Sequence, residues 1–339
     1  MWSPSIGGME TIGSLLAEQI AEQGHDLVVV TPTQSDRPDV GLKYAVIRGP
    51  SAGQLLRLTR WADVVLQHGP SLRLGWPLLV MRKRVAISLH MLFDASDWVA
   101  RVKVALKRLW LRRAAAIVVP SDYMRSVVGL RAHVIPNCYD PRLFGGPVGA
   151  YLALEAPRDE SLIACVARLI PAKGVGLLLH AVAQRRQQFR SVEAKFRIIG
   201  EGPQRRELED LASALGVGDI VRFEGGQSSE GVASLLRQAH VLAVPSIYPE
   251  AFGIIALEGV ASGCVVVAAD SGALPEAAGP EAIVYNSVST DALGAALIQA
   301  LSRRRPTAME VAEHCRSFQP AQVADRYLNV LGRIRPVEV

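Results

Sequence analysis

Short apolar runs rich in β-branched residues recur along the whole chain, and stretches with helical periodicity separate them. The runs are 26–31, 44–47, 62–66, 84–89 and 115–119 in the first half, and 162–167, 195–200, 220–225, 240–246, 263–269 and 282–285 in the second. Helical stretches between buried strands are typical of βαβ units, whose strands lie parallel. The sequence therefore predicts an α/β protein with doubly wound parallel sheets.

The alternation breaks once, in a Gly/Pro-rich passage that follows residue 137 and has no periodic apolar positions. A chain of 339 residues also exceeds what one hydrophobic core usually supports. We therefore expect two Rossmann-like domains facing a cleft, residues 1–147 and 148–319. The apolar spacing of 322–334 predicts a closing helix, and we expect segment 320–339 to return to the first domain.

The start of the first domain departs from this pattern. A doubly wound domain normally has a buried strand before a glycine-rich turn such as "SIGGMETIG", but too few residues precede Gly7 to form one. Two interpretations stay open: the start codon is misassigned, or the first domain lacks this strand.

Composition narrows the class of protein. Half of the residues are apolar and a fifth are charged, which is ordinary for a globular α/β protein. The four cysteines are widely spaced without a CxxC pair, so we expect reduced thiols and neither a zinc site nor a disulfide framework. The N-terminus does not resemble a signal peptide, and no apolar run approaches the ~20 residues of a membrane span. We therefore expect a cytoplasmic protein.

Segment 245–270, "PSIYPEAFGIIALEGVASGCVVVAAD", carries the most information about chemistry. A strand ends, a loop follows, and a helix begins near Phe252 and Gly253. Free backbone N–H groups at a helix N-terminus suit a phosphate, and glycine allows it to approach closely. Glu250 and Glu258 are separated by seven residues, so they can contact different parts of one extended ligand but do not form a tight acid/base dyad.

This segment resembles the Glu-x7-Glu signature of the family-4 retaining glycosyltransferases, which have the two-domain GT-B fold. In the same order as in that family, "VARLIPAKG" (166–174) resembles its Arg-x4-Lys phosphate-binding loop, and "IIGEGPQRRELE" (198–209) resembles the strand, turn and helix beside the nucleotide. "DSGALPEAAGP" (270–280) is similar to its acidic-glycine loop. The resemblance spans nearly the whole second half, and "SIGGMETIG" is similar to the glycine-rich loop of the first domain.

The resemblance implies roles for individual residues. Glu250 would contact hydroxyl groups of the donor sugar, Glu258 the ribose, and His90 would lie near the donor sugar. The residues implied to surround the donor nucleotide are Gly7, Gly8, Arg168, Lys173, Gly202, Glu250, Ala251, Phe252, Gly253, Ile254 and Glu258. Simpler interpretations stay open. Arg168 and Lys173 can be cations on a surface turn, Glu258 a solvated helix residue, and His90 a hydrogen-bonded histidine at a strand end.

The expected reaction moves a sugar from a nucleotide-diphosphate sugar to a glycan, lipid-linked or small-molecule acceptor. Arg168 and Lys173 can stabilise the negative charge of the departing diphosphate, so we count them with Glu250 and His90 as catalytic candidates. The resemblance implies retention of anomeric configuration, although no second carboxylate is placed opposite Glu250. Because Asp-x-Asp does not occur in the sequence, we expect no metal and no other cofactor.

Much of the net charge of +5 lies between residues 82 and 113. In "DWVARVKVALKRLWLRR" (97–113), apolar residues share a helical face with basic residues around it. Such helices lie on anionic membranes, and a core-packed helix with a solvated basic rim gives the same pattern; both interpretations stay open. The candidate membrane contacts are Trp98, Arg101, Lys107, Arg108 and Trp110.

The sequence also allows other classes of function. A nucleotide-sugar epimerase of the same fold, or an inactive nucleotide-sugar-binding or membrane scaffold protein, stays open. A dinucleotide-dependent dehydrogenase is disfavoured, because "GEGPQRR" lacks the third glycine of the dinucleotide fingerprint. No nucleic-acid motif occurs, so we expect no nucleic-acid partner.

Overall fold

The chain folds into two compact units. The first contains residues 1–138 and 317–339, and the second contains residues 139–316. The structure is a computed structural model that describes residues 8–35, 39, 41–81, 83–92, 98–145 and 159–334. The expected boundary between residues 147 and 148 lies outside the described residues.

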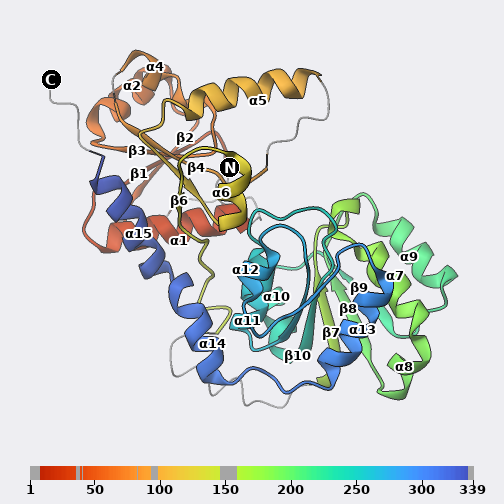
Figure 1. The fold of residues 1–339 in the computed structure, drawn as a ribbon. Coiled ribbons are helices and arrows are strands. Elements are labelled where there is room, and N and C mark those ends of the chain that lie inside the picture. Colours follow the sequence, from red (N-terminus) through yellow and green to blue (C-terminus); the bar gives the residue numbers. More distant parts are fainter. Residues whose placement is uncertain are drawn as a thin grey trace. The chain divides into compact units, whose positions relative to one another are not determined.

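The second unit is built on a parallel sheet with the order β12-β11-β10-β7-β8-β9 (Figure 1). Its strands are β7 (Asp159–Val166), β8 (Lys195–Ile199), β9 (Val221–Gly225), β10 (Ala239–Val244), β11 (Val265–Ala269) and β12 (Ile283–Tyr285). Every residue of β10 and β11 is buried, which explains why these strands appear in the sequence as continuous apolar runs. Strands β7, β8 and β9 follow one another toward one edge of the sheet, and β10, β11 and β12 follow one another toward the other edge.

Helices cover both faces of this sheet. They are α7 (Val175–Gln184), α8 (Arg186–Ser191), α9 (Arg205–Ala214), α10 (Ser229–Gln238), α11 (Ile254–Ala261), α12 (Leu274–Ala278), α13 (Thr290–Leu301) and α14 (Ala308–Cys315). Figure 1 shows α7, α8, α9 and α13 on one face and α10, α11 and α12 on the other. In the core, Phe189 of α8 meets Phe196 of β8 edge to face, with ring centroids 5.1 Å apart. The two layers of helices bury the sheet that carries the loops described below.

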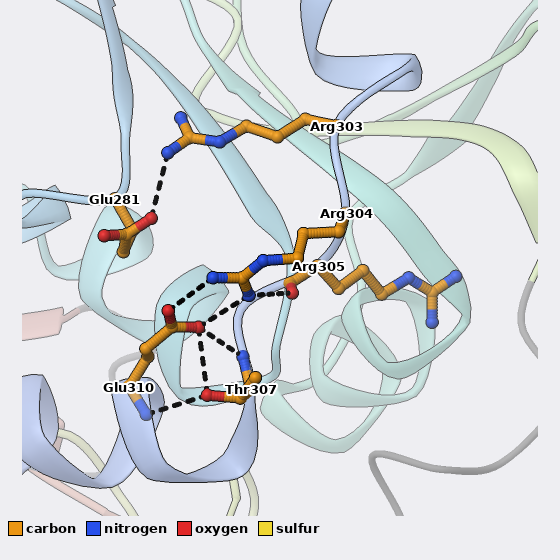
Figure 2. Close-up of polar contacts among 6 residues, drawn as sticks. All are labelled: Glu281, Arg303, Arg304, Arg305, Thr307 and Glu310. Atoms are coloured by element: carbon orange, nitrogen blue, oxygen red, sulfur yellow. Dashed lines mark hydrogen bonds and ion pairs between the residues drawn. The ribbon is translucent and has the colours of Figure 1, made fainter.

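A run of three arginines joins α13 to α14, and Figure 2 shows how ion pairs hold the first two. Arg303 contacts Glu281 at 2.9 Å, and Arg304 contacts both carboxylate oxygens of Glu310 at 2.8 and 2.6 Å. Glu310 also closes a capping box with Thr307 at the start of α14. Arg305 donates to His240 Nδ1 at 2.9 Å. All three guanidinium groups therefore anchor this connection within the unit.

The strands of the first unit form two separate parallel sheets among the described residues. One pairs β1 (Val28–Thr31) with β2 (Ala45–Arg48), and the other has the order β3-β4-β5-β6. The second sheet consists of β3 (Val65–His68), β4 (Val85–Ser88), β5 (Ala116–Val119) and β6 (His133–Val134). In a doubly wound sheet the strand before α1 would lie between these two sheets; the residues that precede α1 lie outside the described part of the chain.

The helices of the first unit come from both ends of the chain. They are α1 (Gly8–Glu22), α2 (Ala52–Trp61), α3 (Leu72–Gly75), α4 (Pro77–Val80), α5 (Trp98–Leu111), α6 (Asp122–Val128) and α15 (Pro320–Gly332). Helix α15 packs beside α1 (Figure 1), and Gln23 Nε2 donates to Asp325 Oδ1 at 2.8 Å. Val323, Ala324 and Tyr327 of α15 are buried. The last helix thus contributes to the core of the first unit.

Candidate functional site

The point where the strand order of the second unit reverses positions the candidate site. Strands β7 and β10 are neighbours and parallel, so the loops that follow them leave the same edge of the sheet. Ligands of open α/β sheets bind outside the carboxyl ends of the strands at such a switch point. Arg168 and Lys173 follow β7, and Glu250 follows β10. The topology therefore brings together two segments that the sequence analysis singled out separately.

Backbone contacts lock these two loops together. The carbonyl oxygen of Ala172 accepts hydrogen bonds from the N–H groups of Ile247 at 3.0 Å and Tyr248 at 3.3 Å. Gly174 permits this approach: its φ is +68°, and a Cβ built on it would lie 1.8 Å from the carbonyl oxygen of Pro245. No other residue type fits without displacing the backbone. The loop that carries Lys173 is thus held against the loop that leads to Glu250.

The contact between the two loops ends in a small polar cluster. Lys173 Nζ forms an ion pair with Oε1 of Glu250, and Ser246 Oγ donates a hydrogen bond to the same oxygen at 2.7 Å. The Lys173 and Glu250 side chains are only 23% and 20% exposed. A partly buried, charge-assisted contact is better shielded from water than a surface salt bridge.

A third loop fixes the backbone of Glu250. Residues Glu250 and Gly272 form an isolated parallel bridge, and the N–H of Ala273 donates to the carbonyl oxygen of Glu250 at 2.9 Å. A Cβ on Gly272, whose φ is +65°, would lie 2.4 Å from that same oxygen. The loop at 270–280 therefore supports Glu250 from the side opposite β7.

Helix α11 starts a few residues after Glu250. Its N-cap is Gly253 at φ +97°, and no side chain in the described part of the protein caps its first turn. A Cβ at Gly253 would lie 2.4 Å from Leu274 Cδ2. Ala251, Phe252 and Ile254 flank this N-cap as the sequence analysis expected, with Phe252 buried. The first turn can therefore direct its backbone N–H groups at an anion, as helix N-termini do.

Glu258 lies one turn further along α11 and differs from Glu250 in its surroundings. Burial, together with a smaller effect of the nearby Asp140 carboxylate, raises the pKa of Glu258 to about 8. Asp140 is itself held by Arg142, whose Nε donates to Oδ1 at 2.9 Å. Near neutral pH Glu258 is therefore largely protonated, and it can donate as well as accept hydrogen bonds.

The glycine-rich loop after β8 packs against the loop after β7. A Cβ at Gly202 would lie 2.3 Å from the carbonyl oxygen of Leu169, and the N–H of Leu169 donates to the carbonyl oxygen of Glu201 at 2.9 Å. Arg168, next to Leu169, is exposed, and its guanidinium has no hydrogen-bond or ion-pair partner among the described residues. This arrangement leaves Arg168 free to meet a ligand.

His90 belongs to the first unit, where it follows β4. Its Nδ1 lies 3.0 Å from Asn137 Oδ1 and its Nε2 lies 3.1 Å from Ser88 Oγ. Because Asn137 Oδ1 can only accept, Nδ1 carries the proton and Nε2 accepts from the serine hydroxyl. Burial lowers the pKa of His90 to about 3, so the ring is neutral. Both nitrogens have partners inside the first unit, and a role of His90 toward the donor stays a prediction.

Helix α5 exposes both apolar and basic side chains. Val102, Leu106 and Leu109 are 50%, 59% and 60% exposed, and they share one face because they lie three or four residues apart. Arg101 and Lys107 are also exposed, as are Lys103 and Arg108. A core-packed helix with a solvated basic rim would expose its basic side chains but bury these three apolar side chains.

Trp110 corrects one part of the expected membrane surface. Its side chain is buried, and its indole Nε1 donates to Gln67 Oε1 at 3.0 Å, so it packs inside the first unit and cannot serve as a lipid anchor. Trp98 begins α5, and its side chain lies outside the described residues. Leu106, which the sequence analysis did not name, lies on the exposed face with Val102 and Leu109; its spacing from these two residues could have identified it.

The structure thus gathers only part of the expected site. It joins Lys173, Glu250 and the start of α11, with Arg168 and Gly202 on adjoining loops of the same unit. Gly8 is the first residue of α1, and Gly7 lies outside the described residues. Sequence reasoning missed Ser246, Gly174 and Gly272 as determinants of the site, although all three lie inside segments that it quoted. Among the described residues, no group of three or more His, Cys, Asp or Glu side chains gathers as metal ligands do.

Two family models match the chain. The model described as Glycosyltransferase Family 4 matches residues 6–143, and the model described as Glycosyl transferases group 1 matches residues 153–318. The chain belongs to the family-4 glycosyltransferases. The family expected from the Glu-x7-Glu and Arg-x4-Lys segments is therefore confirmed.

Individual relatives agree with this assignment. The chain is 34% identical over 218 residues to an MMP alpha-(1->4)-mannosyltransferase of Mycolicibacterium hassiacum, which covers 62% of this chain and 44% of that protein. It is 34% identical over 163 residues to a GDP-mannose-dependent phosphatidylinositol monomannoside mannosyltransferase of Mycolicibacterium smegmatis, covering 45% and 42%. Both matches span less than half of the relative's own length.

Solved structures agree on the fold. The crystal structure of HepE from Anabaena in complex with UDP is similar with a TM-score of 0.77 and 18% identity, over 98% of both chains. At this identity the likeness concerns architecture alone, and it confirms the GT-B fold that the family resemblance implied.

We predict that Gly174→Ala destabilises the second unit. The substitution combines a left-handed backbone, which costs an ordinary residue about 1–3 kcal/mol, with a collision between Cβ and the carbonyl oxygen of Pro245. Gly176→Ala is the matched control, because its Cβ would meet only Leu208 at 3.7 Å and Leu211 at 3.9 Å. Urea unfolding of both variants measures the difference, and equal stabilities would contradict the proposed loop contact.

We also predict that His90 makes the stability of the first unit depend on pH. The folded-state pKa of His90 is lowered to about 3, whereas an unfolded histidine titrates near 6.5. The unfolded chain therefore binds one more proton between these values, and stability is lost as the pH falls below about 6.5. His90→Gln should show a shallower loss than wild type in urea midpoints measured from pH 7 to pH 4. Parallel curves for the two proteins would show that His90 is not buried as a neutral ring.

Proposed function

We propose that the chain is a retaining glycosyltransferase that moves a sugar from a nucleotide-diphosphate sugar to an acceptor without a metal ion. The observation that carries the proposal is the contact of Lys173 with Glu250 at the switch point of the second unit. A cation and a carboxylate held side by side suit the junction between a diphosphate and a sugar, because phosphate needs the cation and sugar hydroxyls need the acceptor.

Different residues of the site act on the diphosphate and on the sugars of the donor. As the bond between the anomeric carbon and the diphosphate oxygen breaks, negative charge grows on the leaving group. Lys173, Arg168 and the N–H groups at the start of α11 offer positive charge there, which supports departure without a divalent ion. Glu250 accepts hydrogen bonds from hydroxyl groups of the transferred sugar, and Glu258 contacts the ribose. An acceptor hydroxyl oxygen then bonds to the anomeric carbon on the face that the diphosphate leaves, and its proton passes to the departing diphosphate oxygen.

The names of relatives suggest which donors to test first. One relative is described as GDP-mannose-dependent, and the HepE structure contains UDP. Both are nucleoside diphosphates, and the cations of this site address the diphosphate that they share. We therefore propose a nucleotide-diphosphate sugar as the donor class and leave the base to direct measurement.

Helix α5 supports a peripheral membrane contact, which would bring the enzyme to a lipid-linked acceptor at the inner face of the cell membrane. Its exposed apolar face, Val102, Leu106 and Leu109, is accompanied by Arg101, Lys103, Lys107 and Arg108. Apolar side chains flanked by cations favour an anionic lipid surface. Among the described residues no helix has the length and apolar content needed to cross a bilayer.

We predict that Glu250→Ala abolishes transfer while nucleotide binding persists, because the carboxylate addresses the sugar and Lys173 the diphosphate. Thermal shifts with UDP, GDP and ADP in EDTA identify the base; binding at a hundred times the dissociation constant adds about 2.7 kcal/mol of stability. Transfer from the matching sugar conjugate is then measured for wild type, Glu250→Ala and Glu313→Ala, an exposed glutamate on α14 that serves as the control.

The outcomes separate the alternatives. Transfer that depends on Glu250 and tolerates EDTA supports the proposal. Isomerisation of the sugar without an acceptor would identify an epimerase instead, and nucleotide binding without turnover would identify a binding protein. Transfer that persists in Glu250→Ala would remove this residue from the reaction.

We predict that replacing Arg101, Lys107 and Arg108 by glutamine weakens binding to phosphatidylglycerol vesicles. Each basic residue near an anionic surface contributes about 1 kcal/mol, so vesicle affinity should fall on the order of a hundredfold. The control replaces Arg57, Arg60 and Arg326, which are exposed in the same unit, and changes the net charge equally. Co-sedimentation measures both variants. Equal losses would point to net charge rather than α5, and no loss would remove the membrane contact.

A further inference from the structure

Ser246 is buried and hydrogen-bonded to Glu250, and the proposed roles of Glu250 and Lys173 do not explain this contact. It follows Pro245 at the end of β10 and is only 2% exposed. Its hydroxyl donates to Oε1 of Glu250 at 2.7 Å. A buried hydroxyl that donates to a carboxylate makes one of the stronger hydrogen bonds available to a neutral side chain.

Both donors to the Glu250 carboxylate contact the same oxygen. Ser246 Oγ and Lys173 Nζ both meet Oε1, and Oε2 has no partner among the described residues. A carboxylate fixed through one oxygen cannot rotate without losing both contacts. The second oxygen is therefore the one left to accept hydrogen bonds from a ligand.

The two donors differ in what a ligand would do to them. Lys173 carries a charge that a diphosphate attracts, so ligand binding draws its ammonium group toward the phosphate and weakens its hold on Glu250. Ser246 is neutral and buried, and it has no such competitor. Its hydrogen bond can therefore keep the carboxylate in place when the lysine engages the diphosphate.

We infer that Ser246 is a positioning residue that orients Glu250 so that Oε2 receives the hydroxyl groups of the transferred sugar. This inference rests on the proposed function and adds a residue to it. It also limits the effect of Ser246 to the sugar half of the donor, because the contacts to the diphosphate come from Lys173, Arg168 and the start of α11. A residue with a merely structural role would affect both halves alike.

The test compares ligand pairs that differ by the sugar alone, GDP with GDP-mannose and UDP with UDP-glucose, using the base that wild type binds. Calorimetry gives the affinity for each ligand with Ser246→Ala. We expect unchanged affinity for the free diphosphate and about tenfold weaker binding of the sugar conjugate, the size of one hydrogen bond to a charged group. Turnover should fall as well, with kcat reduced in addition to a higher KM.

Ser262→Ala is the matched control. Ser262 is 1% exposed, and its Oγ has no hydrogen-bond partner among the described residues, so the variant makes the same chemical change without touching Glu250. It should bind both ligands as wild type does. Ser246→Cys nearly preserves the volume but donates weakly, so its affinity for the sugar conjugate should lie between those of wild type and Ser246→Ala. This second variant also keeps the test decisive if Ser246→Ala does not fold.

Three results would overturn the inference. Equal weakening of the free diphosphate and the sugar conjugate would assign Ser246 a general structural role. Unchanged binding and turnover in Ser246→Ala would show that Glu250 is oriented without it, and wild-type behaviour of Ser246→Cys would show that donation is not what matters. Failure of wild type to bind any nucleoside diphosphate would instead contradict the proposed function itself.

Discussion

The parallel pairing of β7 with β10 is the constraint on which the site depends. Val241 of β10 lies in register with Ile163 of β7, and Leu242 with Ala164. This register sets where each strand ends and therefore where the two following loops meet. The carbonyl of Ala172 completes the contact by accepting two N–H groups from the β10 loop. A shift of one residue in this pairing would separate Lys173 from Glu250 and point the side chains of the shifted strand to the opposite faces of the sheet.

Close approaches of backbone to backbone preserve that geometry at the surface of the unit. Gly174 and Gly272 lie at positive φ where a Cβ would collide with a carbonyl oxygen of the neighbouring loop. Their role is to let three loops share one small volume, so that polar side chains converge on the carboxylate of Glu250. Loops held in this way lose less entropy when a ligand binds, because their ordering is already part of folding.

In the first unit, the buried ring of His90 finds its hydrogen-bond partners inside the same unit. His90 is neutral and has Asn137 and Ser88 as partners, and the buried Tyr327 belongs to a helix from the far end of the sequence. Residues near both ends of the described chain thus complete one core. In the second unit, by contrast, Arg168 on a switch-point loop is exposed, and its guanidinium has no partner among the described residues.

The sequence alone determined the parts of the molecule that depend on neighbours along the chain. Buried parallel strands appear as apolar runs, so the expected 195–200 and 263–269 correspond to β8 and β11. The strand end and the loop after it likewise predicted a helix that starts near Phe252 and Gly253, and α11 begins at Ile254. Tertiary structure decided which residues meet across long separations: that Lys173 and Ser246 share one oxygen of Glu250, and that Trp110 is buried while Leu106 is exposed. These facts follow from strand register and from the packing of whole elements, which local patterns do not encode because they involve partners tens of residues apart.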